Sequence, residues 1–232
     1  MNISIAVIAY NSEKTILETL NSILEQSYGS ENIELIISDD SSSDNTVSIV
    51  KDWISKYKNS FKSISFIEHL VNGGVSKNCN SAWRSCTCEW VKTIAADDIL
   101  LTNCISDNIK FVNKNPECKI VFSKIQTFGI TNGIIPNKFD LRFFDKTSGE
   151  QNTYLKTFSF NIAPSSFINR KVLEKVGYAD EKYKMIEDLP LWLNLTKAGY
   201  KLYFMDSITV NYRIEASITV SIDKCANIPF LY

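Results

Sequence analysis

The stretch IELIISDDSSSDNT, residues 33–46, decides the fold, because a strand-like run leads directly into two carboxylates and a polar turn. Residues 33–38 have the length and branched apolar content of a β-strand. Asp44 is a residue type that caps helices, and an apolar helical face follows it. Asp39 and Asp40 would then stand at the carboxyl end of a strand, where open α/β sheets bind ligands. The expected ligand is a metal-bound phosphate compound.

The same order of strand then helix repeats through the first hundred residues. Further strands are predicted at 3–9, 63–68 and 90–95, and further helices at 12–27 and 75–85. Because each strand is followed by a helical pattern, the chain is expected to form a parallel, doubly wound sheet.

The pattern loosens in the second half of the chain. Residues 124–162 show no clean period and are predicted to form a long irregular insertion, with a hairpin at 128–136. The regular elements expected around it are a helix at 101–114, a strand at 119–123, a helix at 170–176, a helix after Asp188, and strands at 201–206 and 208–213. One large α/β domain with an appended C-terminal part is the expected organisation.

Composition excludes several classes of protein. The 232 residues carry a net charge of -1 and contain no long run of lysine or arginine, so nucleic acid is not an expected partner. The six cysteines are scattered and His69 is the only histidine, which disfavours a zinc site and a histidine-based triad. No apolar run approaches the roughly 18 residues of a bilayer span, and the N-terminus resembles a strand, so a cytoplasmic protein with reduced cysteines is expected.

Two acidic pairs follow predicted strands, and each has two interpretations from the local sequence. Asp39 and Asp40 could accept hydrogen bonds from a uracil imide or from ribose hydroxyls, or could simply cap their turn. Asp97 and Asp98 could hold Mg²⁺ or Mn²⁺ together with a diphosphate, or Asp98 could cap a helix beginning near Leu100.

A third acidic pair, Glu187–Asp188, precedes a predicted helix. Asp188 could be its N-cap, with Glu187 at the positive end of the helix dipole. Alternatively, one of the two could serve as a general base mounted beside a cleft. The local residues leave both interpretations open.

Five motifs in order make the chain resemble the family 2 inverting glycosyltransferases of the GT-A fold. The resemblance extends from about Ile3 to Ser217 and is carried by AYN with Glu13, DDSSSDNT, NGGVSKNCN, AADD and IEDLPLWLNLTKAGYKL. It implies a Rossmann-like, mostly parallel sheet flanked by helices, in a single domain over 1–232. The nucleotide-sugar half would be 1–123 and the acceptor-side half 124–232.

The resemblance also implies roles for individual residues. Tyr10 and Asp40 would contact the nucleotide base, with Glu13, Asp39 and Asn72 nearby. Asp97 would contact the diphosphate-ribose portion of the donor and, with Asp98, bind Mn²⁺ or Mg²⁺. On the acceptor side, Asp188 would be the catalytic base and Glu187 would shape the site.

Four positions depart from the family pattern. Ala95 stands where DxDD usually begins, Asn78 and Cys79 replace Ala-Arg, and Glu215 stands where many relatives carry a metal-binding histidine. We therefore assign Glu215 as a third candidate metal ligand. A QxxRW motif is absent, which predicts transfer of one sugar per encounter.

The function expected from the resemblance is metal-dependent transfer of a sugar from a UDP-sugar to a glycan or lipid-linked acceptor in surface-polysaccharide biosynthesis. Peripheral contact with the inner face of the cytoplasmic membrane rests on the resemblance alone. The alternatives are a weakened nucleotide-sugar or glycan-binding module on the same scaffold, and a two-carboxylate glycoside hydrolase.

Overall fold

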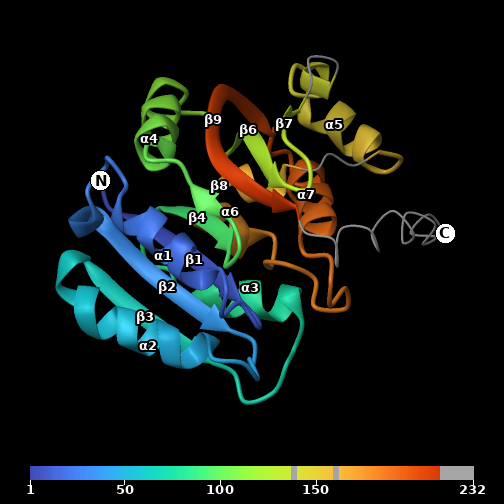
Figure 1. Cartoon of the computed structure of the whole chain (residues 1–232). Helices are drawn as coiled ribbons and strands as arrows, with labels where there is room; N and C mark the ends of the chain where they lie inside the picture. The colour runs from blue at the N-terminus through green and yellow to red at the C-terminus, as the bar shows by residue number, and fades with distance from the viewer. Residues whose placement is uncertain (137–139, 159–161, 215–232) are drawn as a thin grey trace.

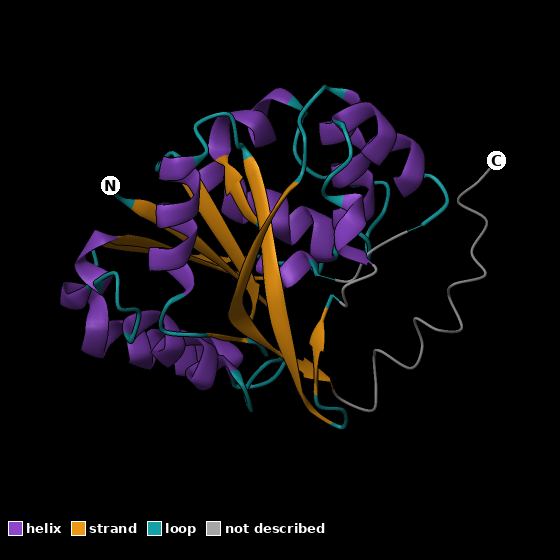
Figure 2. Cartoon of the chain, turned by 90° about the horizontal axis from the view of Figure 1, so that it is seen from above, coloured by secondary structure: helices purple, strands orange, loops and turns teal. Residues whose placement is uncertain are grey.

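The computed structural model describes residues 1–136, 140–158 and 162–214 (Figure 1). Its described strands form one nine-stranded sheet, ordered β3-β2-β1-β4-β8-β6-β9-β5 with β7 paired to β6. Viewed from above, helices lie on both sides of the strands (Figure 2). The architecture is the mostly parallel, helix-flanked GT-A fold that the sequence predicts.

The N-terminal half is the parallel part of the sheet. Its strands are β1 (Ile3–Ala9), β2 (Ile33–Asp39), β3 (Ser63–Glu68) and β4 (Trp90–Ala95). β1 lies between β2 and β4 and is parallel to both. All of β2 is buried, which explains why its sequence is an apolar run rather than an alternating one.

The C-terminal half is mixed. Its strands are β5 (Ile99–Leu100), β6 (Ile120–Gly129), β7 (Gly133–Ile135), β8 (Phe167–Asn169) and β9 (Tyr203–Ile214). β8 is antiparallel to both β4 and β6, and β6 is parallel to β9. The short β5, which follows β4 in the chain, pairs with β9 and forms the last strand at that end of the sheet.

Helices connect the parallel strands. The described α-helices are α1 (Ile16–Leu24), α2 (Thr46–Tyr57), α3 (Val75–Ser85), α4 (Cys104–Lys114), α5 (Ser148–Leu155), α6 (Arg170–Lys175) and α7 (Asp188–Lys197). α1 and α2 contact each other through a 2.9 Å hydrogen bond from the Trp53 indole to Asn21. Among the described helices, none has both the length and the apolar character needed to cross a bilayer.

The second half has its own aromatic core. Phe122 packs edge-on against Trp192, with ring centroids 4.9 Å apart, and Phe144 packs against Phe204 at 5.0 Å. The Asn152 side chain also donates hydrogen bonds to the Leu193 carbonyl and the Thr196 hydroxyl, fastening α5 to α7. These contacts place α7, which begins at Asp188, firmly on the sheet.

The structure corrects several predicted boundaries. The two late strands are one strand, β9, interrupted only by register shifts against β6 near Lys124. The helix predicted to begin at 101 begins at Cys104, and the one predicted over 12–27 is the shorter α1. The insertion contains α5, which has a capping box between Thr147 and Glu150. The spacing of those two residues was a usable signal that the sequence prediction missed.

Candidate active site

The strand register brings the first two acidic pairs to one edge of the sheet. Ala9 of β1 lies beside Asp39 of β2, and Ile8 lies beside Ala95 of β4. The three strands are parallel, so their carboxyl ends open on the same side. Asp39–Asp40 and Asp97–Asp98 therefore flank the end of β1, as the sequence predicts for a ligand crevice.

The carboxylates of the first pair are buried and engaged by neighbouring loops. Asp39 accepts hydrogen bonds from the main-chain amide and the hydroxyl of Ser42 at 2.9 and 2.5 Å. The two oxygens of Asp40 accept from the amides of Gly73 and Gly74, both at 2.8 Å. The turn interpretation thus describes the Asp39 contacts, whereas contact of either residue with a nucleotide base stays a prediction.

The loop that follows β1 and the loop that follows β2 are joined by hydrogen bonds at this edge of the sheet. Asn11 accepts a 2.8 Å hydrogen bond from the amide of Ser43, and Glu13 accepts from the amide and side chain of Asn45 at 3.0 and 2.8 Å. Tyr10, in contrast, is 52% exposed at the end of β1. Asn72 is exposed beside the Gly73–Gly74 amides. Glu13 thus has a structural partner at the start of α2, while Tyr10 and Asn72 present accessible side chains.

Asp98 does not cap a helix, because the next helix, α4, begins at Cys104 and not near Leu100, and its N-cap is Asn103. The side chain is buried, and its Oδ1 accepts a 2.9 Å hydrogen bond from the amide of Arg213. Its Oδ2 is buried without a hydrogen-bond partner in the described part of the chain. Burial and the neighbouring charge of Asp97 raise the pKa of Asp98 well above its ordinary value. The nearby positive charges of Lys92 and Arg213 act in the opposite direction but do not offset the burial.

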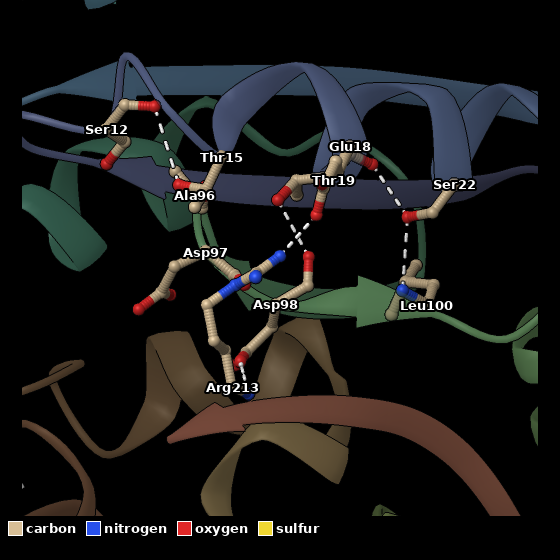
Figure 3. A network of polar contacts seen from close by, with 10 residues as sticks. All are labelled: Ser12, Thr15, Glu18, Thr19, Ser22, Ala96, Asp97, Asp98, Leu100 and Arg213. Atoms are coloured by element: carbon tan, nitrogen blue, oxygen red, sulfur yellow. Dashed lines mark hydrogen bonds and ion pairs between the residues drawn. The ribbon is translucent and has the colours of Figure 1, made fainter. Parts of the chain in front are cut away.

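Hydroxyl groups on one face of α1 hold the segment that carries this pair (Figure 3). Thr15 at the start of the helix donates to the Ala96 carbonyl at 2.8 Å, and Thr19 donates to the Asp98 carbonyl at 2.7 Å. One turn later, Ser22 accepts from the Leu100 amide at 3.1 Å. Residues 15, 19 and 22 share a helical face, so this pattern was visible in the sequence, but it was not predicted.

Arg213 of β9 closes the segment from the other side, as Figure 3 shows. Its Nε donates to the Asp97 carbonyl at 2.8 Å, and its guanidinium forms an ion pair with Glu18 of α1. The same guanidinium lies over the Phe128 ring, 4.5 Å from the centroid. We call Glu18 and Arg213 the bracket; sequence reasoning did not find it, because its members are distant in the chain.

The third pair, Glu187–Asp188, is partly buried at the start of α7. Glu187 occupies the N-cap position without a side-chain hydrogen bond to the helix, and Asp188 accepts a 2.6 Å hydrogen bond from the Leu189 amide. Of the two interpretations, the one in which Asp188 caps α7 is therefore wrong, and its role as a base stays a prediction. Burial and the charge of Asp188 raise the pKa of Glu187 to about 7, and burial raises that of Asp188.

Cys79 lies beneath this pair. Its side chain is 2% exposed, and burial followed by the charges of Glu187 and Asp188 raises the pKa of its thiol well above the ordinary value. At this position the resemblance leads one to expect an arginine, and the neutral thiol that stands there supplies no positive charge.

Tyr212 of β9 is affected by both the second and the third acidic pair. Its pKa is raised to about 12, first by burial and then by the charges of Asp98, Asp97, Asp188 and Glu187. The two pairs are therefore both within electrostatic range of this one phenol.

The chemistry of Asp97–Asp98 fits a divalent cation. The unpartnered Oδ2 of Asp98 and its raised pKa indicate a carboxylate that needs a positive partner, and hard oxygen ligands suit Mg²⁺ or Mn²⁺. Within the described residues there is no group of three or more protein ligands, so a bound diphosphate would supply further oxygens. The predicted ligand Glu215 lies outside the described residues.

The sequence predicts reduced cysteines. The structure describes five of the six, and all five are free thiols.

The sequence comparisons define the family. The family model described as Glycosyl transferase family 2 matches residues 4–177, and the chain belongs to that family of glycosyltransferases. One relative is UDP-Glc:alpha-D-GlcNAc-diphosphoundecaprenol beta-1,3-glucosyltransferase WfaP of Escherichia coli, 32% identical over 96% of this chain and 80% of that protein. Another is poly(ribitol-phosphate) beta-N-acetylglucosaminyltransferase TarS of Staphylococcus aureus, 27% identical over 81% of this chain and 31% of that protein.

Solved structures show the same fold. S. aureus TarS residues 1–349 in complex with UDP-GlcNAc aligns with a TM-score of 0.77 at 23% identity, over 95% of this chain and 61% of that one. The mannosyltransferase PcManGT of Pyrobaculum calidifontis, in complex with GDP-Man and Mn²⁺, aligns with a TM-score of 0.70 at 18% identity, over 95% and 59%. The chain therefore spans about three fifths of these solved chains.

Proposed function

We propose that this chain catalyses metal-dependent, inverting, non-processive transfer of one sugar from a UDP-sugar to a glycan acceptor carried on a lipid. The observation that carries the proposal is the Asp98 carboxylate, which is buried beside Asp97 with one oxygen unpartnered among the described residues. A divalent cation held by Asp97 and Asp98 would compensate the charge of both carboxylates. The names of WfaP and of the TarS complex support a UDP-sugar donor, and the WfaP name supports a diphospholipid acceptor.

On the donor side, residues 1–123 would hold the nucleotide. Exposed Tyr10 can stack on the base, while Asp39, Asp40 and Glu13 hold the loops that surround it. Each oxygen of Asp40 already accepts one hydrogen bond from a glycine amide. To accept another from the base, Asp40 would use the second lone pair of one of these oxygens. Exposed Asn72 stands at the same loop.

Asp97 and Asp98 would hold the cation, which when bound neutralises negative charge developing on the departing diphosphate. Arg213 holds the Asp97 carbonyl and one Asp98 carboxylate oxygen, and Glu18 pairs with its guanidinium, so this segment is ordered before the donor binds. Tyr212 is within electrostatic range of this pair and of the acceptor-side pair.

On the acceptor side, residues 124–232 would present Glu187 and Asp188. Asp188 takes the proton of the acceptor hydroxyl, and the oxygen forms a bond to the anomeric carbon from the face opposite the phosphate. The bond between the anomeric carbon and the phosphate oxygen breaks, and its electron pair leaves with UDP. The configuration at that carbon is inverted. A lipid-borne acceptor would bring the protein to a membrane surface.

The test is release of UDP and formation of a glycosylated product from a panel of UDP-sugars, with a synthetic diphospholipid-linked sugar as acceptor. We expect turnover with Mn²⁺ or Mg²⁺, loss with chelator and recovery on adding metal. Asp188→Asn should bind UDP like the wild type but transfer no sugar. Metal-independent cleavage of a glycan would support a hydrolase instead. UDP binding without turnover of any donor would support a binding module.

A further inference from the structure

The segment 177–187 between α6 and α7 contains no helix or strand; it ends at Glu187, and Asp188 is the first residue of α7. It runs along α3, whose side chains and N-terminal amides contact it at several points. Figure 1 shows the loop beside α3. The segment also begins with two residues of positive φ, Gly177 and Tyr178, so its path leaves α6 abruptly. Because the segment has no secondary structure of its own, contacts from other elements must fix the position of Glu187.

Asn80 of α3 makes the most complete contact with this segment. Its side chain is 1% exposed, and Oδ1 accepts a 2.9 Å hydrogen bond from the Ala179 amide. The Nδ2 group donates to the Ala179 carbonyl at 2.9 Å and to the Glu181 carboxylate at 2.8 Å. One buried amide side chain thus satisfies both main-chain groups of Ala179 and orients a carboxylate.

Ser76 makes the second contact, one helical turn earlier on the same face of α3. Its hydroxyl donates to the Tyr183 carbonyl, and its amide donates to the Lys184 carbonyl at 3.4 Å. Cys79 stands between Ser76 and Asn80 on that face and lies near Glu187 and Asp188. This face of α3 therefore contacts the segment from Ala179 to Lys184 and lies within electrostatic range of the acidic pair.

The start of α3 is itself tied to the donor side of the site. Asn78 donates from Nδ2 to the carbonyls of Ala9 and Ser38, at 3.1 and 3.2 Å; Ala9 is the last residue of β1 and Ser38 the last but one of β2. The two glycine amides before the helix are bound by Asp40. One rigid helix therefore contacts both the donor-side strand ends and the acceptor-side segment.

We propose that Ser76 and Asn80 are positioning residues that place Glu187 and Asp188 relative to the donor site. This inference rests on the proposed function of the acidic pair. Neither residue touches the reacting atoms; both act by holding the main chain of residues 179–184. A displacement of about 1 Å in a catalytic group can lower the rate by roughly 10²-fold. The hydrogen bonds from Ser76 and Asn80 to residues 179–184 should therefore affect the rate of transfer.

Asn80→Asp tests the proposal with nearly unchanged volume. The variant keeps the acceptor for the Ala179 amide but loses both donated bonds and places a carboxylate against Glu181. We expect kcat for sugar transfer to fall by roughly 10–100-fold. The Kd for UDP with Mn²⁺ should change less than about twofold, since the donor-side contacts are unaltered. Hydrogen exchange in residues 178–188 should accelerate.

Two further variants serve as a control and as a second test of the positioning role. Ser81→Ala removes a hydroxyl that bonds only to the Lys77 carbonyl within α3, so kcat and exchange should match the wild type. Ser76→Ala removes the bond to Tyr183 with a small change in volume, and should show the Asn80→Asp pattern more weakly. If Asn80→Asp does not fold, Ser76→Ala takes its place as the test of the positioning role.

The outcomes separate this inference from the proposed function. If the wild type transfers no sugar, the proposed function fails, while exchange in 178–188 still decides whether α3 holds the segment. Exchange unchanged in Asn80→Asp and Ser76→Ala overturns the positioning role. A kcat equal to the wild type with a loosened segment overturns it as well, because placement would then not depend on these residues.

Discussion

The main-chain amide of Arg213 donates a 2.9 Å hydrogen bond to Oδ1 of Asp98, across 115 positions of sequence. β5, which directly follows the acidic pair, lies antiparallel to β9, and this pairing brings the two residues together. The guanidinium of Arg213 then reaches over the Asp97 carbonyl to Glu18. The candidate metal site is therefore built on contacts between the N-terminal helix and the last described strand.

Glu18→Gln tests the bracket. The ion pair is partly exposed, with side-chain exposures of 17% and 55%, so the free energy of unfolding should fall by no more than about 1 kcal/mol. Affinity for UDP with Mn²⁺ should fall several-fold, because Arg213 would hold the Asp97–Asp98 segment less firmly. Calorimetric titration and chemical denaturation measure the two effects. Glu174→Gln, which breaks the 3.7 Å ion pair with Arg170, is the matched control and should leave UDP affinity unchanged.

Asp98→Asn tests the charge of the candidate metal site. Because burial and Asp97 raise the pKa of Asp98, the ionised form is disfavoured, and a neutral side chain of the same shape should leave the metal-free protein at least as stable. Thermal stabilisation by UDP with Mn²⁺ should disappear, and transfer should fall by roughly 10²-fold or more if the cation supplies several kcal/mol. Full metal-dependent stabilisation in the variant would contradict the assignment.

Gly74→Ala tests the junction between the donor-side loop and the acceptor-side segment. Gly74 has φ of +86°, and a Cβ there would stand 2.6 Å from the Lys184 carbonyl. A cost of about 1–3 kcal/mol in the free energy of unfolding is expected. Gly149→Ala is the control, because a Cβ at that position of α5 meets nothing within 4 Å. Alanine there should stabilise the helix by about 0.5–1 kcal/mol. Equal effects at the two glycines would contradict the prediction.

The pair Glu187–Asp188 should make stability depend on pH. The pKa of Glu187 is raised from 4.5 to about 7, so between these values the folded state binds more protons than the unfolded state. The free energy of unfolding contributed by this group is therefore highest below pH 4.5 and falls as pH rises towards 7. Glu187→Gln should flatten this part of the curve relative to the wild type. Denaturation of both proteins from pH 4 to 8 gives the comparison, and parallel curves would show that Glu187 titrates normally.

Asp188→Asn extends this test to the coupling between the two carboxyls. The charge of Asp188 is the second cause, after burial, of the raised pKa of Glu187. Removing that charge should lower the pKa of Glu187 while leaving it above the ordinary value, because the burial remains. Carbon-detected NMR of the glutamate carboxyl follows the titration directly. A Glu187 pKa unchanged from the wild type would mean that burial alone raises it.

Much of the parallel half of the fold was predictable, because its apolar runs are long and local. The strands at 3–9, 63–68 and 90–95 and the helix at 75–85 have the predicted bounds. β9 was split in two because a bulge opposite Lys124 interrupts its pattern of burial. α5 was missed because it has only a weakly one-sided apolar pattern, although its capping box was present.

The sequence by itself determined which carboxylates stand at strand and helix ends, since apolar periodicity and chain order are local properties. It could not exclude a helix cap at Asp98, because the start of α4 after Asn103 and the contact from Arg213 are seen only in the fold. Likewise, only the tertiary structure brought Tyr212 within electrostatic range of two acidic pairs and laid residues 179–184 against α3. Burial and neighbouring charge set the protonation of Glu187 and Asp98, and both depend on segments that the fold alone brings together.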